Sequence, residues 1–174
     1  MTLYHFTRKE YLSSILKHGL DKGDVPLNVR QTVNGVGLTE DGDPSKQGWT
    51  TFVPQKRQYR LLVDVDPADR RLLRWTEIPH KLRVDNRFWK LNSAKALGDT
   101  AKWWVSFLPI QPSRLLEIFD TVLGRILTAE ELQQISQQPE TRGCNMWRLR
   151  AVPFEQAMRN SFTTGEARGE FFRN

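Results

Sequence analysis

The side chains best suited to chemistry lie within the first seven residues of the chain. Leu3-Tyr4-His5-Phe6-Thr7 alternates as a β-strand does, so the side chains of His5 and Thr7 are expected on one face of it. Burying an imidazole and a hydroxyl together is costly unless each finds a partner. His5 is therefore interpreted either as a ligand-contacting group or as an interior histidine bonded to backbone, and Thr7 on the same face favours the first.

The elements that must position His5 follow from the pattern of apolar residues. Thr7 and Glu10 have the spacing of a capping box, which predicts a helix start, and Gly19 predicts its end. Residues 21–34 are rich in turn formers and are expected to form a long loop. Strands are predicted at 36–39, 60–65, 72–75, 103–107 and, as the final strand, 115–119, and helices at 87–97, from Thr128 to about 137, and from Pro153 to 162.

Composition places the chain among globular proteins. Its 174 residues fit one domain, 39% of them are hydrophobic, and no apolar run approaches the roughly 20 residues that span a bilayer. The amino terminus lacks the layout of a signal peptide, the single cysteine cannot form an internal disulfide, and no Cys/His cluster has the spacing of a zinc site. We expect a cytoplasmic protein with no membrane partner and no structural metal.

The positive charge is concentrated in the middle of the chain. The formal net charge is +6, and residues 56–102 carry twelve basic against six acidic groups, whereas residues 1–55 carry six of each. A local positive field favours an anionic partner, such as a nucleic acid, a phosphate-bearing cofactor or an acidic protein. The same pattern also suits a solvated face with the intervening Trp75, Phe88 and Trp89 turned inward.

Several segments together resemble the ADP-ribosyltransferase-like superfamily. They are Tyr4-His5-Phe6-Thr7 with its helix ending Gly19-Leu20, Val36-Gly37-Leu38-Thr39-Glu40, Leu61-Leu62-Val63-Asp64-Val65, and the run from Val105-Ser106-Phe107 through Ile110-Gln111-Pro112 to Leu115-Leu116. The resemblance covers about residues 2–120. It implies an α+β fold of split antiparallel β-sheets with flanking helices over 1–122, followed by a helical extension over 123–174.

The resemblance also implies a role for individual residues toward NAD. His5 would hydrogen-bond the ribose, the backbone of Phe6 would hold the nicotinamide amide, and Thr7 would support that pocket. Leu38 and Thr39 would pack against the nicotinamide ring, where the family often has an aromatic residue. Trp49 is expected to replace that aromatic residue by stacking.

One family feature is missing from the chain. The resemblance implies a glutamate at the front of the late strand, at about Trp103, but no glutamate occurs from residue 78 to residue 116. A carboxylate there stabilises positive charge on the ribose when the nicotinamide bond breaks, so its loss would cost roughly a hundredfold in rate. Asp99, Glu40 or Asp41 could replace it, or the target or a phosphate could supply the negative charge. Trp103 and Trp104 are interpreted as core residues, or one of them lines the pocket in place of the glutamate.

Three functions follow from the resemblance. The leading one is NAD-dependent transfer of ADP-ribose to a protein or nucleic-acid target, in a toxin, a phage effector or a housekeeping factor. The second is a catalytically inactive module of the same fold that inhibits or recruits a partner through the basic 56–102 surface. The third is an RNA 2′-phosphotransferase-like enzyme, which would need help in the cleft from Arg30 or Arg60.

Overall fold

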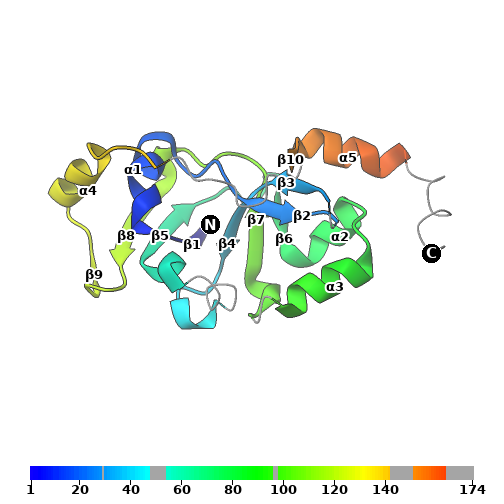
Figure 1. The fold of residues 1–174 in the computed structure, drawn as a ribbon, viewed down its shortest axis with the longest axis horizontal. Coiled ribbons are helices and arrows are strands. Elements are labelled where there is room, and N and C mark those ends of the chain that lie inside the picture. Colours follow the sequence, from blue (N-terminus) through cyan, green and yellow to red (C-terminus); the bar gives the residue numbers. More distant parts are fainter. Residues whose placement is uncertain (29, 48–53, 96–97, 142–150, 164–174) are drawn as a thin grey trace.

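The computed structural model describes residues 1–28, 30–47, 54–95, 98–141 and 151–163 as a mixed α+β fold (Figure 1). The strands are β1 (Thr2–Thr7), β2 (Asp24–Pro26), β3 (Thr32–Asn34), β4 (Val36–Thr39), β5 (Tyr59–Asp64), β6 (Leu72–Arg74), β7 (Trp103–Ser106), β8 (Leu115–Asp120), β9 (Arg125–Ile126) and β10 (Ala151–Val152). The α-helices are α1 (Lys9–His18), α2 (Ile78–Lys81), α3 (Asn86–Lys95), α4 (Ala129–Ser136) and α5 (Phe154–Thr163). Short 3-10 helices include η1 (Pro44–Lys46), η3 (Pro54–Arg57), η4 (Trp75–Glu77), η5 (Thr100–Lys102) and η6 (Pro112–Arg114).

Seven antiparallel strands form the main sheet. Their order is β6-β7-β4-β1-β5-β8-β9, so the strand that carries His5 lies at the centre. Strands β7, β4 and β1, which carry Trp103, Leu38 and His5, are consecutive in this order even though β7 is about a hundred residues from β1 in the chain. Apolar residues such as Leu3, Leu38 and Val105 are buried in these strands, and burial of a strand face specifies its register.

The pairing of β1 is uneven on its two sides. On one side β1 pairs with β5 along its whole length, from Thr2 opposite Asp64 to Thr7 opposite Tyr59. On the other side the registered pairing with β4 is confined to Tyr4 opposite Thr39. The two central strands therefore separate beyond Tyr4, on the side where His5 follows.

A second, three-stranded sheet lies beside the main one, in the order β10-β3-β2. β2 and β3 form an antiparallel hairpin, and β10 runs parallel to β3. The expectation of a loop over 21–34 is thus wrong, because Val25 and Val33 on this hairpin are buried and supply apolar contacts that its turn-rich composition conceals. The second sheet joins the hairpin to the carboxyl-terminal part of the chain.

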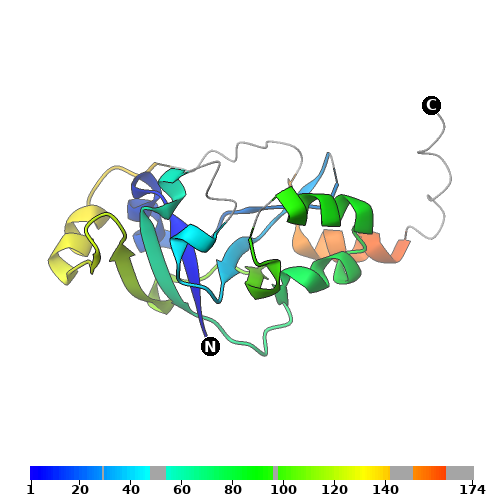
Figure 2. The same ribbon diagram turned by 90° about the horizontal axis from the view of Figure 1, so that it is seen from below.

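Two hydrophobic cores hold the layers together. In the first, Leu12 and Ile15 of α1 cover Leu3, Leu61 and Val63 of the sheet, and α4 packs on α1. In the second, the sheet residues Leu73 and Val105 pack with the small sheet and with helices α2, α3 and α5. Figure 2 shows the same division from below, with α1 and α4 at one end of the molecule and α3 and α5 at the other.

Helix α1 ends at Gly19 as predicted, but its amino-terminal end differs from the prediction. The predicted capping box does not form: Arg8 is the N-cap and makes no side-chain cap bond, because the strand continues to Thr7 and buries that side chain. Gly19 does end the helix, with φ of 80°, and its N–H donates to the Ile15 carbonyl. A Cβ atom there would lie 2.0 Å from the Ile110 carbonyl oxygen, so only glycine fits.

The carboxyl-terminal part contributes strands as well as helices. β8 is not the final strand, because β9 pairs with it and β10 joins the small sheet, and the expected boundary at residue 122 falls in the β8–β9 hairpin. The capping box of α4 is confirmed: Thr128 accepts from the Glu131 N–H, and Glu131 accepts from the Thr128 N–H. Among the described residues no helix is long and apolar enough to cross a membrane.

Candidate functional site

His5 lies where β1 and β4 separate, and its ring bridges the gap. Nδ1 is 2.9 Å from the carbonyl oxygen of Gly37 in β4. Since a carbonyl only accepts, Nδ1 carries the hydrogen and donates it, which leaves Nε2 as an acceptor. No residue in the described part of the chain is hydrogen-bonded to Nε2. The site therefore presents a fixed imidazole with one acceptor position open.

The protonation state of His5 follows from its surroundings. The solvent-accessible surface of His5 as a whole residue is intermediate, but protein atoms surround its ring closely. This desolvation, joined by the positive charge of Lys56 and opposed by the bond to the Gly37 carbonyl, lowers the pKa of His5 from 6.5 to about 4. His5 is thus neutral at pH 7, which is the state an acceptor Nε2 requires.

Gly37 makes an opening in the middle of the sheet. It lies in a central strand, but it is exposed, and no described atom lies within 4 Å of a Cβ placed on it. A glycine inside a strand often marks a place where another group approaches the backbone closely. The backbone of β4 is therefore accessible beside His5, and this opening is the strongest sign of a binding site in the structure.

Charged groups gather near the same end of β1. Burial lowers the pKa of Lys56, on η3, and the nearby Arg8 lowers it further, while Asp24 on β2 raises it. Burial also raises the pKa of Asp24. The Asp24 Oδ1 and Arg8 Nε atoms are buried with no hydrogen-bond partner among the described residues. Arg8 also donates to Glu10 Oε1 at 3.2 Å. The positive charges of Lys56 and Arg8 lie close together here, so an additional anionic group would be favoured at this end of the site.

The register decides which tryptophan shares a face with His5. Tyr4 pairs with Thr39 and Thr39 with Trp103, so these three side chains lie on one face. His5, Leu38 and Trp104 follow them on the opposite face, because neighbouring residues alternate. Trp103, at the position where the resemblance implies a glutamate, is buried, and its ring is edge-on to Trp75 with centroids 5.7 Å apart.

The carboxylate that reaches the front of β7 comes from the neighbouring strand. Glu40 follows β4, and its Oε1 accepts from Trp104 Nε1 at 2.9 Å. The same oxygen lies 3.2 Å from a guanidinium nitrogen of Arg74, which also stacks on the Trp104 ring. Glu40 is still 40% exposed by its side chain, so a ligand can approach it.

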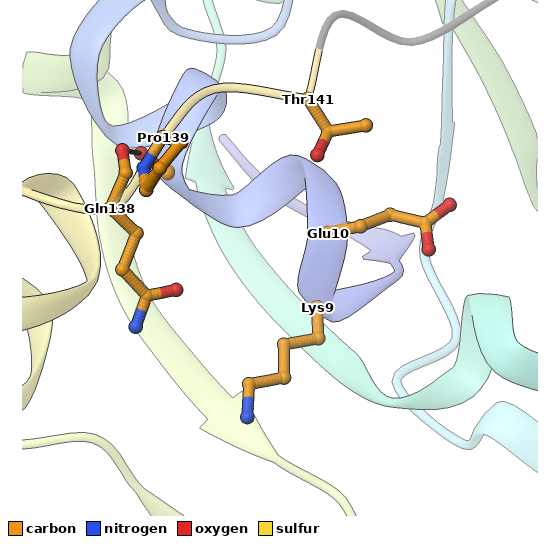
Figure 3. A pocket seen from close by; sticks show the side chains of 6 residues that line it. Lys9, Glu10, Gln138, Pro139 and Thr141 are labelled. Carbon is orange, nitrogen blue, oxygen red and sulfur yellow. Dashed lines mark hydrogen bonds between the residues drawn. The ribbon is translucent and has the colours of Figure 1, made fainter.

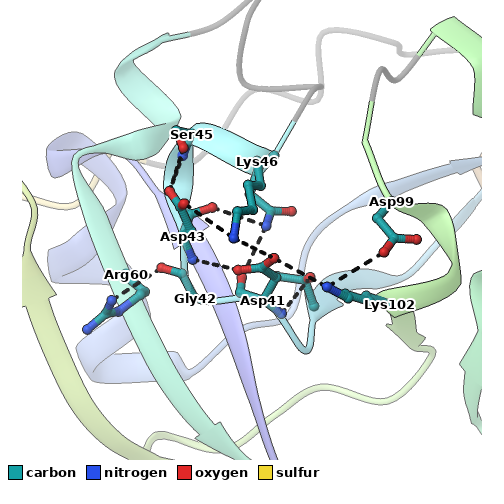
Figure 4. Close-up of polar contacts among 10 residues, drawn as sticks. Asp41, Gly42, Asp43, Ser45, Lys46, Arg60, Asp99 and Lys102 are labelled. Carbon is teal, nitrogen blue, oxygen red and sulfur yellow. Dashed lines mark hydrogen bonds and ion pairs between the residues drawn. The ribbon is translucent and has the colours of Figure 1, made fainter.

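The other expected replacements are part of a polar network beside Glu40 (Figure 4). Lys102 lies 3.6 Å from both Asp41 and Asp99, and Asp99 also caps η5 through the Ala101 N–H. Lys46 lies 3.8 Å from Asp41. The Asp99 and Asp41 carboxylates are thus each paired with lysine, whereas the Glu40 carboxylate is held by Trp104 and Arg74.

Most of the remaining predicted site residues lie in the interior of the protein. Phe6, Thr7, Leu38 and Thr39 are all buried, and the Thr39 hydroxyl accepts from the Asp41 N–H. Trp49 lies outside the described residues. Among the described residues no group of three potential ligands could hold a metal ion.

Arg30 and Arg60, the two arginines considered for phosphate chemistry, do not interact with the His5 ring through a hydrogen bond. Arg60 lies over the Phe119 and Tyr4 rings, donates to the Gly42 carbonyl and is 3.7 Å from Glu117. Arg30 is exposed at the turn between β2 and β3. No hydrogen bond or ion pair joins either of these described arginines to His5.

Two cavities stand out, and neither is lined by His5. One, of about 420 Å³, lies between α1 and the segment after α4, where Ser13 donates to the Gln138 carbonyl (Figure 3). The other, of about 520 Å³, lies near β6 and α5. Neither cavity is lined by Gly37, so the opening beside His5 is described by the exposed backbone of β4.

Sequence reasoning missed Gly37 and Lys56 as members of the site. The pattern Val36-Gly37-Leu38 does contain a signal for Gly37. A glycine inside a strand weakens the strand, and it often marks a place where a ligand or another backbone approaches closely. No local pattern points to Lys56, because it meets His5 only through the fold. Comparison of the chain with protein-family models, with curated proteins and with solved structures gave no match.

Proposed function

We propose that this protein is an NAD-dependent ADP-ribosyltransferase that modifies a protein or nucleic-acid target. The observation that carries the proposal is the neutral His5, fixed on the Gly37 carbonyl beside an exposed strand backbone. The adjacency of β1, β4 and β7 supports it, because the three segments that resemble the family's motifs then line one place.

The chain's own groups fit the parts of NAD. The Nε2 atom of His5 can accept from a ribose hydroxyl, and the bare backbone at Gly37 allows a flat nicotinamide ring to lie close to β4. Arg8 and Lys56 supply positive charge for the diphosphate. The substrate would then span from the gap between β1 and β4 toward η3.

Glu40 is the group we assign to the charge that develops on the ribose. Transfer breaks the bond between the nicotinamide nitrogen and the ribose carbon, the leaving nicotinamide keeps the electron pair, and the acceptor bonds to that carbon and gives up a proton. The Glu40 carboxylate is already fixed by its hydrogen bond from Trp104 Nε1, so it needs little reorganisation to stabilise positive charge on the ribose carbon. Arg74 restrains the same carboxylate and limits how strongly it acts.

The test is transfer of label from NAD to proteins and nucleic acids of a cell lysate. We expect a labelled product with the wild type and its loss with His5→Ala. His18→Ala is the matched control, because His18 is exposed and its contact is with Glu140 at the far end of α1. Labelling that persists in His5→Ala, or is absent from the wild type, contradicts the transferase.

The buried Trp103 favours a second candidate, a binding module of the same fold without the chemistry. In that case the wild type would bind NAD or a partner at the same opening but transfer no label. Measuring NAD binding alongside transfer separates the two: binding with transfer supports the enzyme, and binding without transfer supports the module.

A further inference from the structure

The cavity of about 520 Å³ lies three strands away from β1, at the edge of the sheet formed by β6. The connection between β5 and β6, helix α2 and helix α5 surround it. Its volume falls within the roughly 300–1,000 Å³ typical of small-molecule sites. It is separate from the opening at Gly37 and needs its own explanation.

The floor of this cavity is apolar and partly aromatic. Leu73 is buried there, and Phe154 of α5 stacks on Phe107, with ring centroids 4.4 Å apart and planes 21° apart. The half-buried Met158 lies one turn further along α5. A flat ring is the shape that such a floor accommodates best, because aromatic and thioether groups contact π-faces favourably.

The rim of the cavity is cationic. Arg70 and Lys81 are exposed, and neither has an ion-pair partner among the described residues, whereas Arg71 is paired with Asp69 at 3.2 Å. Glu155 is the other acid of the lining. Residues 66–95 around the cavity carry eight basic and four acidic groups, so the surrounding field is also positive. Two unpaired cations at one rim suit a doubly charged anion better than a single carboxylate.

We propose that this cavity binds a nucleobase bearing a phosphate. The base would rest against Leu73, Phe154 and Met158, and the phosphate would meet Arg70 and Lys81. The ligand is either a free nucleoside monophosphate or the phosphorylated end of a single-stranded nucleic acid, since both present the same chemistry. The site does not depend on NAD chemistry at His5.

The test is calorimetric titration of the full chain with uridine 5′-monophosphate. Ribose 5-phosphate and uridine serve as probes that lack the base and the phosphate respectively. We expect each to bind at least tenfold more weakly than the nucleotide. We also expect the double variant Arg70→Gln/Lys81→Gln to lose at least tenfold in affinity for the nucleotide.

The matched control is Arg87→Gln/Lys90→Gln, which removes the same charge from exposed positions of α3 outside the cavity lining. Unchanged affinity in this control and in His5→Ala supports the site and separates it from the proposed transferase. Equal loss in both double variants, equal binding of all three probes, or no binding of the nucleotide overturns it. A 5′-phosphorylated oligothymidine that binds more tightly than the mononucleotide identifies a strand end as the source, and equal affinity identifies the free nucleotide.

Discussion

Protonation of His5 is expected to destabilise the fold, and this can be measured without any ligand. The ring donates from Nδ1 to Gly37 and sits in desolvating surroundings, which lower its pKa to about 4. In the unfolded chain the pKa returns to about 6.5. Between these values the unfolded state binds a proton that the folded state does not, so the free energy of unfolding falls as the pH falls.

The size of the effect follows from the same two pKa values. Each pKa unit corresponds to about 1.4 kcal/mol, so the full shift would correspond to about 3 kcal/mol. Because His5 keeps some contact with water, we expect about 1–3 kcal/mol. The contribution is fully present above pH 6.5 and is lost progressively from pH 6.5 down through pH 4.

The assay is urea unfolding of the wild type and of His5→Gln at half-unit steps from pH 7 to pH 4. Glutamine can still donate an amide hydrogen to the Gly37 carbonyl, but it does not titrate, so the carboxylates of the chain affect both proteins alike. We expect the stability of the wild type relative to the variant to drop by about 1–3 kcal/mol. A difference that stays flat, or that grows on acidification, refutes a buried neutral imidazole.

Three further perturbations have defined outcomes. Glu40→Gln is expected to lower label transfer at least tenfold while the affinity for NAD stays within about twofold, and an equal loss of both would contradict its role at the ribose. Gly19→Ala is expected to lower the free energy of unfolding in urea by roughly 2–4 kcal/mol. The loss should be distinctly greater than for Gly124→Ala, because Gly124 also has a positive φ, of 69°, but open space around a Cβ atom. Similar losses in the two variants would mean that the clash with Ile110 is relieved. Thr128→Ala is expected to cost about 1 kcal/mol through the lost cap of α4, and no change in thermal midpoint would argue against that cap.

Local signals predicted the elements that local chemistry decides. The strand at 3–7, the stop at Gly19 and the capping box of Thr128 with Glu131 are all present, because each depends on residues within a few positions. The capping box proposed for Thr7 failed for a non-local reason: pairing with Tyr59 of β5 holds Thr7 in the strand.

Features that depend on distant partners were not predictable in the same way. The hairpin within 21–34 gains its stability from the second core and from β10, more than a hundred residues away. The site itself has this character, since Gly37, Lys56 and Asp24 meet His5 or one another only in the folded chain. Periodicity identified the strand of His5 but not the groups that face it.

Binding of NAD at the exposed backbone beside His5 is tested by calorimetric titration of NAD into the wild type and into Gly37→Val. Valine suits a β-strand, and its first side-chain carbon meets no described atom at this position, so the variant is expected to be as stable as the wild type or more stable. We expect the wild type to bind NAD and the variant to lose at least tenfold in affinity, because the new side chain covers the bare backbone of β4, on the face of Tyr4 and Thr39, where the nicotinamide ring would approach the strand. Undiminished binding by a folded Gly37→Val protein, or no binding by the wild type, would contradict this expectation.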